Sequence, residues 1–197
     1  MRAAKKRRRR LFFAGGLPAA SDSARSSEPH TKAVTMHALT EKDIRASFVN
    51  ASQRERAAVV MPDLAEIDWA ERDFLGWRPP KTPLAAYAVI PVDDDLIGIV
   101  LRQTEQRTLA RTQCAWCEDV TLPNEVVLFS AKRAGRAGRN GNTVGTLVCE
   151  HFECSQNVRR LPPPAYLGFD VEAARARRME ALRLRITDFA RDLRDNT

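Results

Sequence analysis

Four cysteines, arranged as two local pairs, constrain the fold of this 197-residue chain more than any other feature. Two residues separate Cys114 from Cys117, four separate Cys149 from Cys154, and the chain has no other cysteine. A structural zinc ion takes four ligands at tetrahedral corners, with each sulfur about 2.3 Å from the metal. A single tight turn can supply each pair, so the spacing predicts that all four thiols bind one zinc ion.

The segments around the pairs indicate how such a site would be built. EVVLFSAKR (125–133) and TVGTLVC (143–149) are rich in β-forming residues, and the glycine-rich AGRAGRNGN joins them, which predicts a hairpin. The second pair would then lie in a turn that enters a short helix. A knuckle, a hairpin and a ligand-bearing turn before a helix, in this order, form the layout of a treble-clef zinc finger.

Other interpretations of the cysteines stay open. A redox CxxC follows a strand directly, whereas TEQRTLARTQ before Cys114 is polar. Disulfides suit a secreted chain, and the thiols could also be unrelated core residues. His151 could replace one cysteine as a ligand, although an outer or exposed position is favoured. With four cysteines bound, the zinc ion has no open position for water, so we expect a structural ion and no enzyme.

The net charge of +7 belongs to the N-terminal part of the chain. Residues 1–35 hold nine Lys and Arg against Asp22 and Glu28, whereas Lys and Arg balance Asp and Glu over 36–197. We expect 1–35 to be a disordered basic tail, with Met36 as an alternative start, and 36–197 to be the folded domain. Leu11–Ala20 is too short and too broken by glycine and proline for a membrane span, and makes a poor signal peptide.

The hydrophobic pattern predicts an α+β fold. LTEKDIRASFVNAS predicts a helix with Thr40 as N-cap and Asp43 completing the capping box. Residues 85–92 and 96–102 predict a hairpin, with Asp93–Asp95 as a solvated turn. Asp170 is expected to cap a long amphipathic C-terminal helix whose apolar stripe is Met179, Leu182, Ile186, Phe189 and Leu193. The result is a small β-hairpin/sheet core with a treble-clef zinc finger and this helix.

Candidate partner-binding residues gather after the strand at 125–133. A glycine-rich loop would present four cations to an acidic protein surface or to phosphates: Lys132, Arg133, Arg136 and Arg139. A solvated loop is the alternative. Phe129 is either a core residue, which we favour, or an exposed aromatic anchor. Phe189 is a further candidate contact on the last helix.

Several stretches together resemble one known family. SFVNAS (47–52), LGWRPPK (75–81), IGIVLR (97–102), CAWC, AKRAGRAGRNGNTVGTLVC and CSQNVR resemble the C-terminal treble-clef zinc-finger domain of elongation factor G-binding proteins, the FusB-type fusidic-acid-resistance family. The similarity runs from about Leu39 to Asn196. It implies a structural zinc held by Cys114, Cys117, Cys149 and Cys154, with the position of His151 usually acidic. The resistance proteins carry an N-terminal helical domain that residues 1–35 do not resemble.

The resemblance implies a function in translation. We expect a non-enzymatic, cytoplasmic, monomeric zinc-finger protein that binds elongation factor G and promotes its release from the ribosome, without a membrane partner. The alternative is a protein that binds RNA or the ribosome through its basic tail and arginine-rich loop.

Overall fold

A computed structural model describes residues 36–104, 112–119 and 124–195, all within one compact unit, Ala33–Thr197. The predictions for the basic tail at 1–35 lie outside the described residues. No helix in this described part is both long and apolar enough to span a membrane.

A five-stranded antiparallel sheet, in the order β1-β2-β3-β4-β5, forms the centre of this unit. Both hairpins expected from the sequence are confirmed, and the turn between β2 and β3 places Asp93 at a positive φ of 55°. β3 and β4 pair at only two positions, so the two hairpins diverge beyond this junction. The strands are β1 (Leu75–Trp77), β2 (Ala85–Val92), β3 (Asp95–Gln103), β4 (Val126–Lys132) and β5 (Thr143–Cys149).

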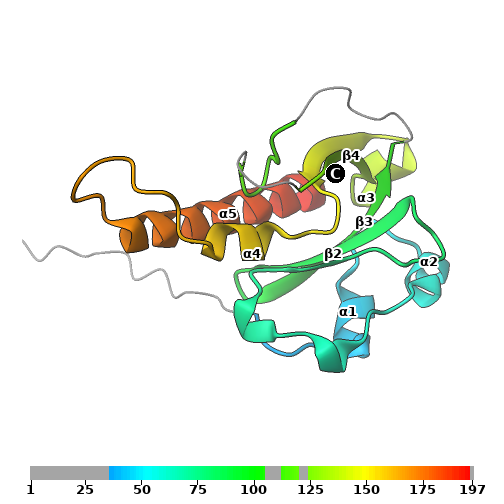
Figure 1. The fold of residues 1–197 in the computed structure, drawn as a ribbon. Helices are drawn as coiled ribbons and strands as arrows, with labels where there is room; N and C mark the ends of the chain where they lie inside the picture. Colours follow the sequence, from blue (N-terminus) through cyan, green and yellow to red (C-terminus); the bar gives the residue numbers. More distant parts are fainter. Residues whose placement is uncertain (1–35, 105–111, 120–123, 196–197) are drawn as a thin grey trace, which may run out of the picture. The chain divides into compact units, whose positions relative to one another are not determined.

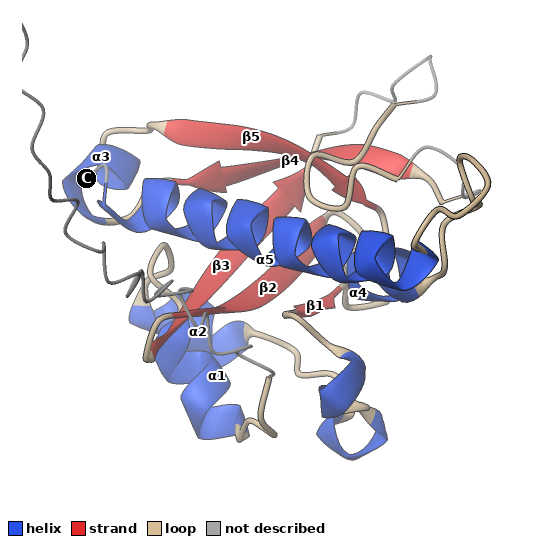
Figure 2. Cartoon of the chain, turned by 90° about the vertical axis from the view of Figure 1, so that its left-hand side faces the viewer, coloured by secondary structure: helices blue, strands red, loops and turns tan. Residues whose placement is uncertain are grey.

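The long helix α5 (Val171–Asp195) crosses one face of this sheet (Figure 2). The Asp170 carboxylate caps the helix by accepting the Ala173 N–H at 2.9 Å, as the sequence predicts. The expected stripe is confirmed: Leu182, Ile186 and Leu193 are buried, and Met179 and Phe189 pack against the same core. This core also contains all four cysteines, so the metal-binding candidates and the main hydrophobic core are one structure.

The short helix α1 (Glu41–Ser47) places Ile44 in a second hydrophobic cluster, and a further short helix, α2 (Gln53–Ala58), buries no residue of its own. In Figure 1, α1 and α5 lie on opposite sides of β2 and β3. The Thr40 capping box is present as predicted, and Phe48 is fully buried beside Trp77 and Tyr87.

The segment from 61 to 77 contains short regular elements. It forms two 3₁₀ turns, Leu64–Glu66 and Trp69–Glu71, and then β1. Phe74, Leu75 and Trp77 of this segment are buried, whereas Trp69 is half-buried.

Arginines of α5 bind the rest of the domain. Arg191 bonds both Asp93 oxygens, at 2.8 and 2.9 Å, and Arg194 lies 3.6 Å from Asp95. Asp93–Asp95 are all exposed, as expected of a solvated turn, and two of them also pair with α5. Arg183 contacts Asp73 at 2.9 Å. The Asp73 carboxylate is buried and also pairs with Arg159, so loss of either arginine would leave a poorly compensated buried charge.

Gly98 of β3 packs closely against the end of α1. A Cβ at this position would lie 2.4 Å from Ser47 Oγ and 2.9 Å from the Phe48 nitrogen, because β3 runs directly against the end of α1.

We predict that Gly98→Ala lowers the free energy of unfolding by about 1–3 kcal/mol, measured by urea denaturation. Gly145→Ala is the matched control, since its Cβ would make only ordinary contacts, with Leu128 Cδ1 at 3.5 Å and the Phe129 carbonyl oxygen at 3.9 Å. Equal stability of the two variants would contradict this packing.

Candidate metal centre

The first cysteine pair lies in a tight turn that points both sulfurs inward. Cys114 Sγ accepts the backbone N–H groups of Trp116 at 3.4 Å and Cys117 at 3.5 Å. The Ala115 N–H donates to the Leu147 carbonyl at 2.7 Å, which fixes the turn to β5. Glu118 ends the turn with a positive φ of 53°. This is the knuckle expected from two cysteines separated by two residues.

The second pair joins the end of a strand to the start of a helix. Cys149 is the last residue of β5, and Cys154 is the first residue of α4 (Cys154–Arg159). Between them the chain reverses: the Phe152 N–H donates to the Cys149 carbonyl at 3.0 Å, and Phe152 has a positive φ of 60°. The four-residue spacing is therefore the length that this turn requires.

The four sulfurs are close enough to share one ion. Cys114 Sγ lies 3.6 Å from Cys154 Sγ, Cys117 Sγ lies 3.7 Å from Cys149 Sγ, and all four atoms are within 4.8 Å of one another. A regular tetrahedron with metal–sulfur distances of about 2.3 Å has edges of about 3.8 Å. All four residues are buried. Spacing, burial and ligand type therefore all fit zinc.

Without a cation, the four thiols compete for protons. Hydrogen bonds from Cys117 and then Cys149 hold the pKa of the Cys114 thiol well below its ordinary value. The interaction with Cys114 raises the pKa values of Cys149 and Cys154. A thiolate at Cys114 thus opposes ionisation of Cys149 and Cys154, whereas a divalent cation would allow all four to ionise together.

Asn157 supports the sulfurs from α4. Its side chain is buried, and its Nδ2 lies 3.6 Å from Cys149 Sγ and 3.8 Å from Cys117 Sγ. An amide that donates to metal-bound sulfur offsets negative charge and fixes ligand orientation. The sequence analysis missed this residue. Its place three residues after Cys154, one turn into the predicted helix, is the signal that could have found it.

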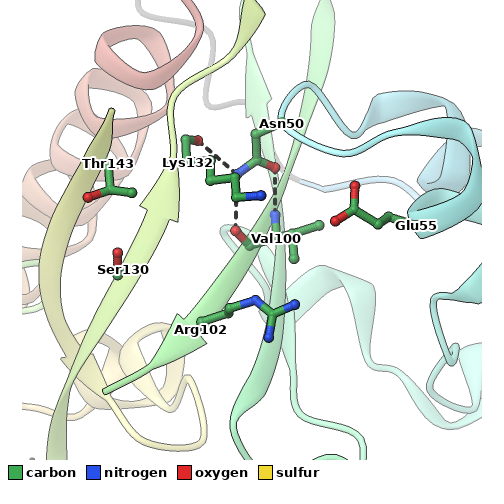
Figure 3. Close-up of a pocket in the computed structure, with 7 residues that line it drawn as sticks. All are labelled: Asn50, Glu55, Val100, Arg102, Ser130, Lys132 and Thr143. Carbon is green, nitrogen blue, oxygen red and sulfur yellow. Dashed lines mark hydrogen bonds between the residues drawn. The ribbon is translucent and has the colours of Figure 1, made fainter. Parts of the chain in front are cut away.

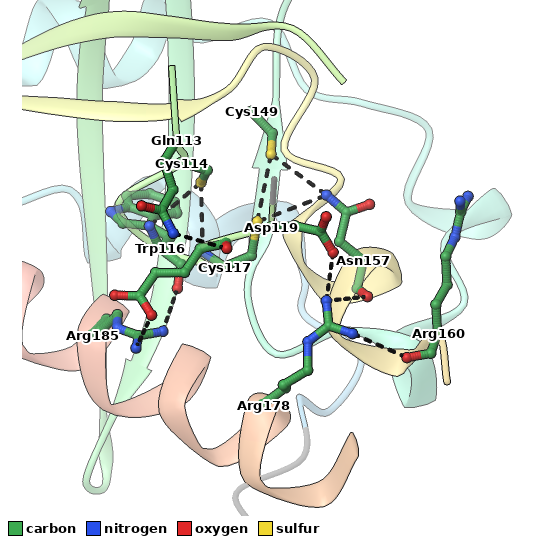
Figure 4. Close-up of polar contacts among 11 residues, drawn as sticks. Gln113, Cys114, Trp116, Cys117, Asp119, Cys149, Asn157, Arg160, Arg178 and Arg185 are labelled. Atoms are coloured by element: carbon green, nitrogen blue, oxygen red, sulfur yellow. Dashed lines mark hydrogen bonds and ion pairs between the residues drawn. The ribbon is translucent and has the colours of Figure 1, made fainter. Parts of the chain in front are cut away.

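Two arginines of α5 hold the knuckle from outside (Figure 4). Arg178 pairs with Asp119 and also donates to the Asn157 carbonyl at 3.2 Å. Arg185 pairs with Glu118 at 2.5 Å and donates to the Trp116 carbonyl at 3.3 Å. The long helix is therefore bonded directly to the residues that follow the first cysteine pair.

Aromatic rings fill the space beside the sulfurs. Trp116 is buried and packs edge-on against Phe74, with the ring centroids 5.1 Å apart. Phe129 stacks on Phe152 at 5.5 Å and is fully buried, so it lies in the core, as favoured, and exposes no surface to a partner. Phe189 is partly buried, 5.7 Å from Trp116.

The basic residues expected on a hairpin loop lie in different environments. The expected open loop is instead a short helix, α3 (Gly135–Arg139). Arg133 is turned inward to the Asp192 carboxylate, at 3.1 Å. Lys132, Arg136 and Arg139 are exposed.

Gly138 explains why this segment is compact. A Cβ at Gly138 would lie 1.8 Å from the Arg133 carbonyl oxygen, so the glycine allows the helix to pack on its own strand. His151 is exposed and lies outside the group of four sulfurs, and its backbone N–H donates to the Glu153 carboxylate.

A knuckle, a β-hairpin and a cysteine at the start of a helix, arranged around four buried sulfurs, define a treble-clef zinc-binding protein. The family model described as "FBP C-terminal treble-clef zinc-finger" matches residues 43–193, so the chain belongs to this family. The four cysteines provide the site for its cofactor, one zinc ion.

One solved structure is similar to part of the chain. The fusidic acid resistance protein FusC shares 24% sequence identity with a TM-score of 0.42, over 53% of this chain and 47% of FusC. The chain thus spans about half the length of that protein. No curated protein matches the chain.

We predict that Cys117→Ser lowers the zinc content well below one ion per chain and abolishes cooperative thermal unfolding, because zinc-binding free energy contributes directly to folding. Metal analysis and calorimetry measure both effects. His151→Ala is the control, and we expect it to retain zinc and the wild-type melting temperature. Zinc loss in the histidine variant with retention in the cysteine variant would reverse the ligand assignment.

A second prediction concerns Asn157. Asn157→Asp replaces the amide donor beside Cys117 and Cys149 with a carboxylate, so zinc affinity should fall by about 10–100-fold in competition with a chelator. Gln156→Glu makes the same chemical change at an exposed position of α4 and should leave the affinity unchanged. Equal affinities would show that the amide does not act on the sulfurs.

Proposed function

We propose that this protein is a non-enzymatic zinc-finger protein that binds elongation factor G in the cytoplasm. Membership of the FBP C-terminal zinc-finger family across residues 43–193 is the observation that carries this proposal. Release of elongation factor G from the ribosome is the second part of the proposal.

The proposed ligands are Cys114, Cys117, Cys149 and Cys154, and the ion acts as a structural element. Four sulfurs complete the tetrahedral shell of zinc, so the metal has no position for a substrate. The ion would join the knuckle, β5 and α4, which carry the packing surface for α5. Binding free energy of the metal would thereby hold the partner-binding surface in one shape.

The proposed contact with elongation factor G lies on the exposed cations around α3. Lys132, Arg136 and Arg139 are exposed, and the compact α3 fixes the backbone positions of both arginines. The Asn140 N–H lies within hydrogen-bond distance of the Arg136 and Ala137 carbonyls, at 3.0 and 3.1 Å, which closes the helix. In this proposal, Phe129, Arg133 and Phe189 act through the fold: Phe129 stacks on Phe152, Arg133 pairs with Asp192 and Phe189 packs on Trp116.

We predict that the full chain co-elutes with purified elongation factor G at about 0.15 M salt, where exposed charges more than about 8 Å apart are largely screened. Arg136→Glu should weaken binding about tenfold, because it places a negative charge on a surface meant for an acidic partner. Arg177→Glu is the control, since Arg177 is an exposed arginine of α5.

Absence of co-elution with the wild-type chain would overturn the proposed function. Co-elution with equal affinity for both variants would retain the function and move the contact away from α3.

A further inference from the structure

A groove runs between the segment Val49–Glu55 and the end of β4 with α3. It consists of two hollows, of about 120 and 350 Å³, which share Asn50, Glu55 and Lys132 in their walls. Figure 3 shows the smaller hollow, with side chains from β3, β4 and β5 on one side and Glu55 on the other.

The groove exists because β3 and β4 separate. Their pairing is limited to Arg102 with Ser130 and Gln103 with Phe129. Beyond these pairs, the Asn50 side chain bridges the strands. It accepts the Val100 N–H at 2.9 Å and donates to the carbonyls of Val100 and Lys132, each at 3.0 Å. The floor of the groove is therefore fixed by hydrogen bonds.

Positive charge dominates the walls. Arg102, Lys132 and Arg139 line the groove, and none of them forms an ion pair with another residue that the structure describes. Arg133 also lines it, but its guanidinium is paired with Asp192. In contrast, arginines of α5 such as Arg178, Arg183, Arg185 and Arg191 pair with acids inside the domain. The groove thus holds three cations that form no ion pair with a described residue.

Glu55 is the one carboxylate among the described lining residues. Its Oε2 accepts the Ser52 N–H and Oγ–H, each at 2.8 Å, in the capping box of α2. These hydrogen bonds, first the backbone one and then the hydroxyl one, lower the pKa of Glu55, and the charges of Lys132 and Arg102 add to the effect. Glu55 is therefore ionised and cancels part of the positive charge.

The remaining lining is polar and small. Ser52, Ser130 and Thr143 contribute hydroxyl groups, while Val49, Ala51 and Val100 are the apolar members. No aromatic side chain is among the described lining residues. Protein partners are usually held by large aromatic or apolar anchors in pockets. Nucleic-acid phosphates are held by arginine, lysine and small hydroxyl donors, which is the composition of this groove.

We propose that this groove binds the phosphodiester backbone of a single-stranded nucleic acid, with Arg102, Lys132 and Arg139 contacting phosphates. This binding shares Lys132 and Arg139 with the contact proposed for elongation factor G, so the two partners would compete, but it does not require that proposal to hold. Two adjoining hollows that share three lining residues suit an extended chain more than a compact ligand. An acidic protein segment is the competing occupant, and the test below distinguishes the two.

The test uses the full chain and fluorescein-labelled oligonucleotides of about twelve nucleotides, oligo-U and oligo-dT, in fluorescence anisotropy titrations. The groove variant carries Arg102→Gln, Lys132→Gln and Arg139→Gln. The control variant carries Lys42→Gln, Lys81→Gln and Arg177→Gln, three exposed cations away from the groove lining. Both variants lose the same charge and retain residues 1–35.

Affinity should fall at least tenfold in the groove variant and by less than about threefold in the control. Each phosphate contact on a single strand changes the slope of log K against log salt by about 0.7, so the slope should decrease by about 2 in the groove variant alone. Preference between oligo-U and oligo-dT then identifies RNA or DNA as the source of the phosphates.

In contrast to the groove variant, Glu55→Gln should increase the affinity for the oligonucleotide. Glutamine can still accept the Ser52 N–H in a capping box, so the α2 cap is retained. Removal of the negative charge should raise oligonucleotide affinity about threefold, by less repulsion within the groove. A variant that merely unfolds cannot produce this gain.

Two outcomes would overturn the proposal. One is an equal loss of affinity in the groove and control variants, with no gain for Glu55→Gln, because charge anywhere on the surface would then suffice. The other concerns competition by an unlabelled poly-glutamate peptide of about the same length as the oligonucleotide. If this peptide displaces the labelled oligonucleotide at a lower concentration than unlabelled oligo-U does, the groove belongs to an acidic protein segment.

Discussion

The mutual repulsion of four buried thiolates is the constraint on which the rest of the structure depends. The sulfurs of Cys114, Cys117, Cys149 and Cys154 lie within 4.8 Å of one another inside the main core. Such a cluster is stable with all four groups ionised only around a cation. The aromatic residues Phe74, Trp116 and Phe152 pack on the elements that carry these sulfurs. The chain thus combines its metal site and its hydrophobic core in one unit, which lets a small sheet hold a long helix.

Basic residues have two distinct environments in this domain. On α5, Arg178, Arg183 and Arg185 pair with Asp119, Asp73 and Glu118, and these ion pairs fix the helix to separate parts of the fold. Around β4 and α3, most of them face solvent without an ion pair to a described residue, Arg133 being the exception. The same residue type therefore stabilises the fold on one side and is available for binding on the other.

Local patterns predicted much of this fold. The spacing of the cysteines, the two hairpins and the apolar stripe of α5 each depend on residues near one another in sequence, and periodicity or turn chemistry reveals them. Residues with distant partners were harder to predict. Asp73 meets Arg159 and Arg183 from α4 and α5, and Asn50 bridges Val100 and Lys132. Short elements such as β1 and α3 depend on tertiary contacts, with Gly138 fitted against Arg133, so no sequence period indicates them.

The bonds from Arg178 and Arg185 to the knuckle connect metal supply to the lifetime of the protein. These arginines hold α5 against Asp119 and Glu118, the residues that follow the first cysteine pair. A chain made during zinc starvation would have a loosened knuckle, and α5 would lose these two attachments and expose Leu182 and Ile186. Exposed apolar helices are substrates for chaperones and proteases. Cellular amounts of this protein would therefore follow zinc availability, without any dedicated sensor.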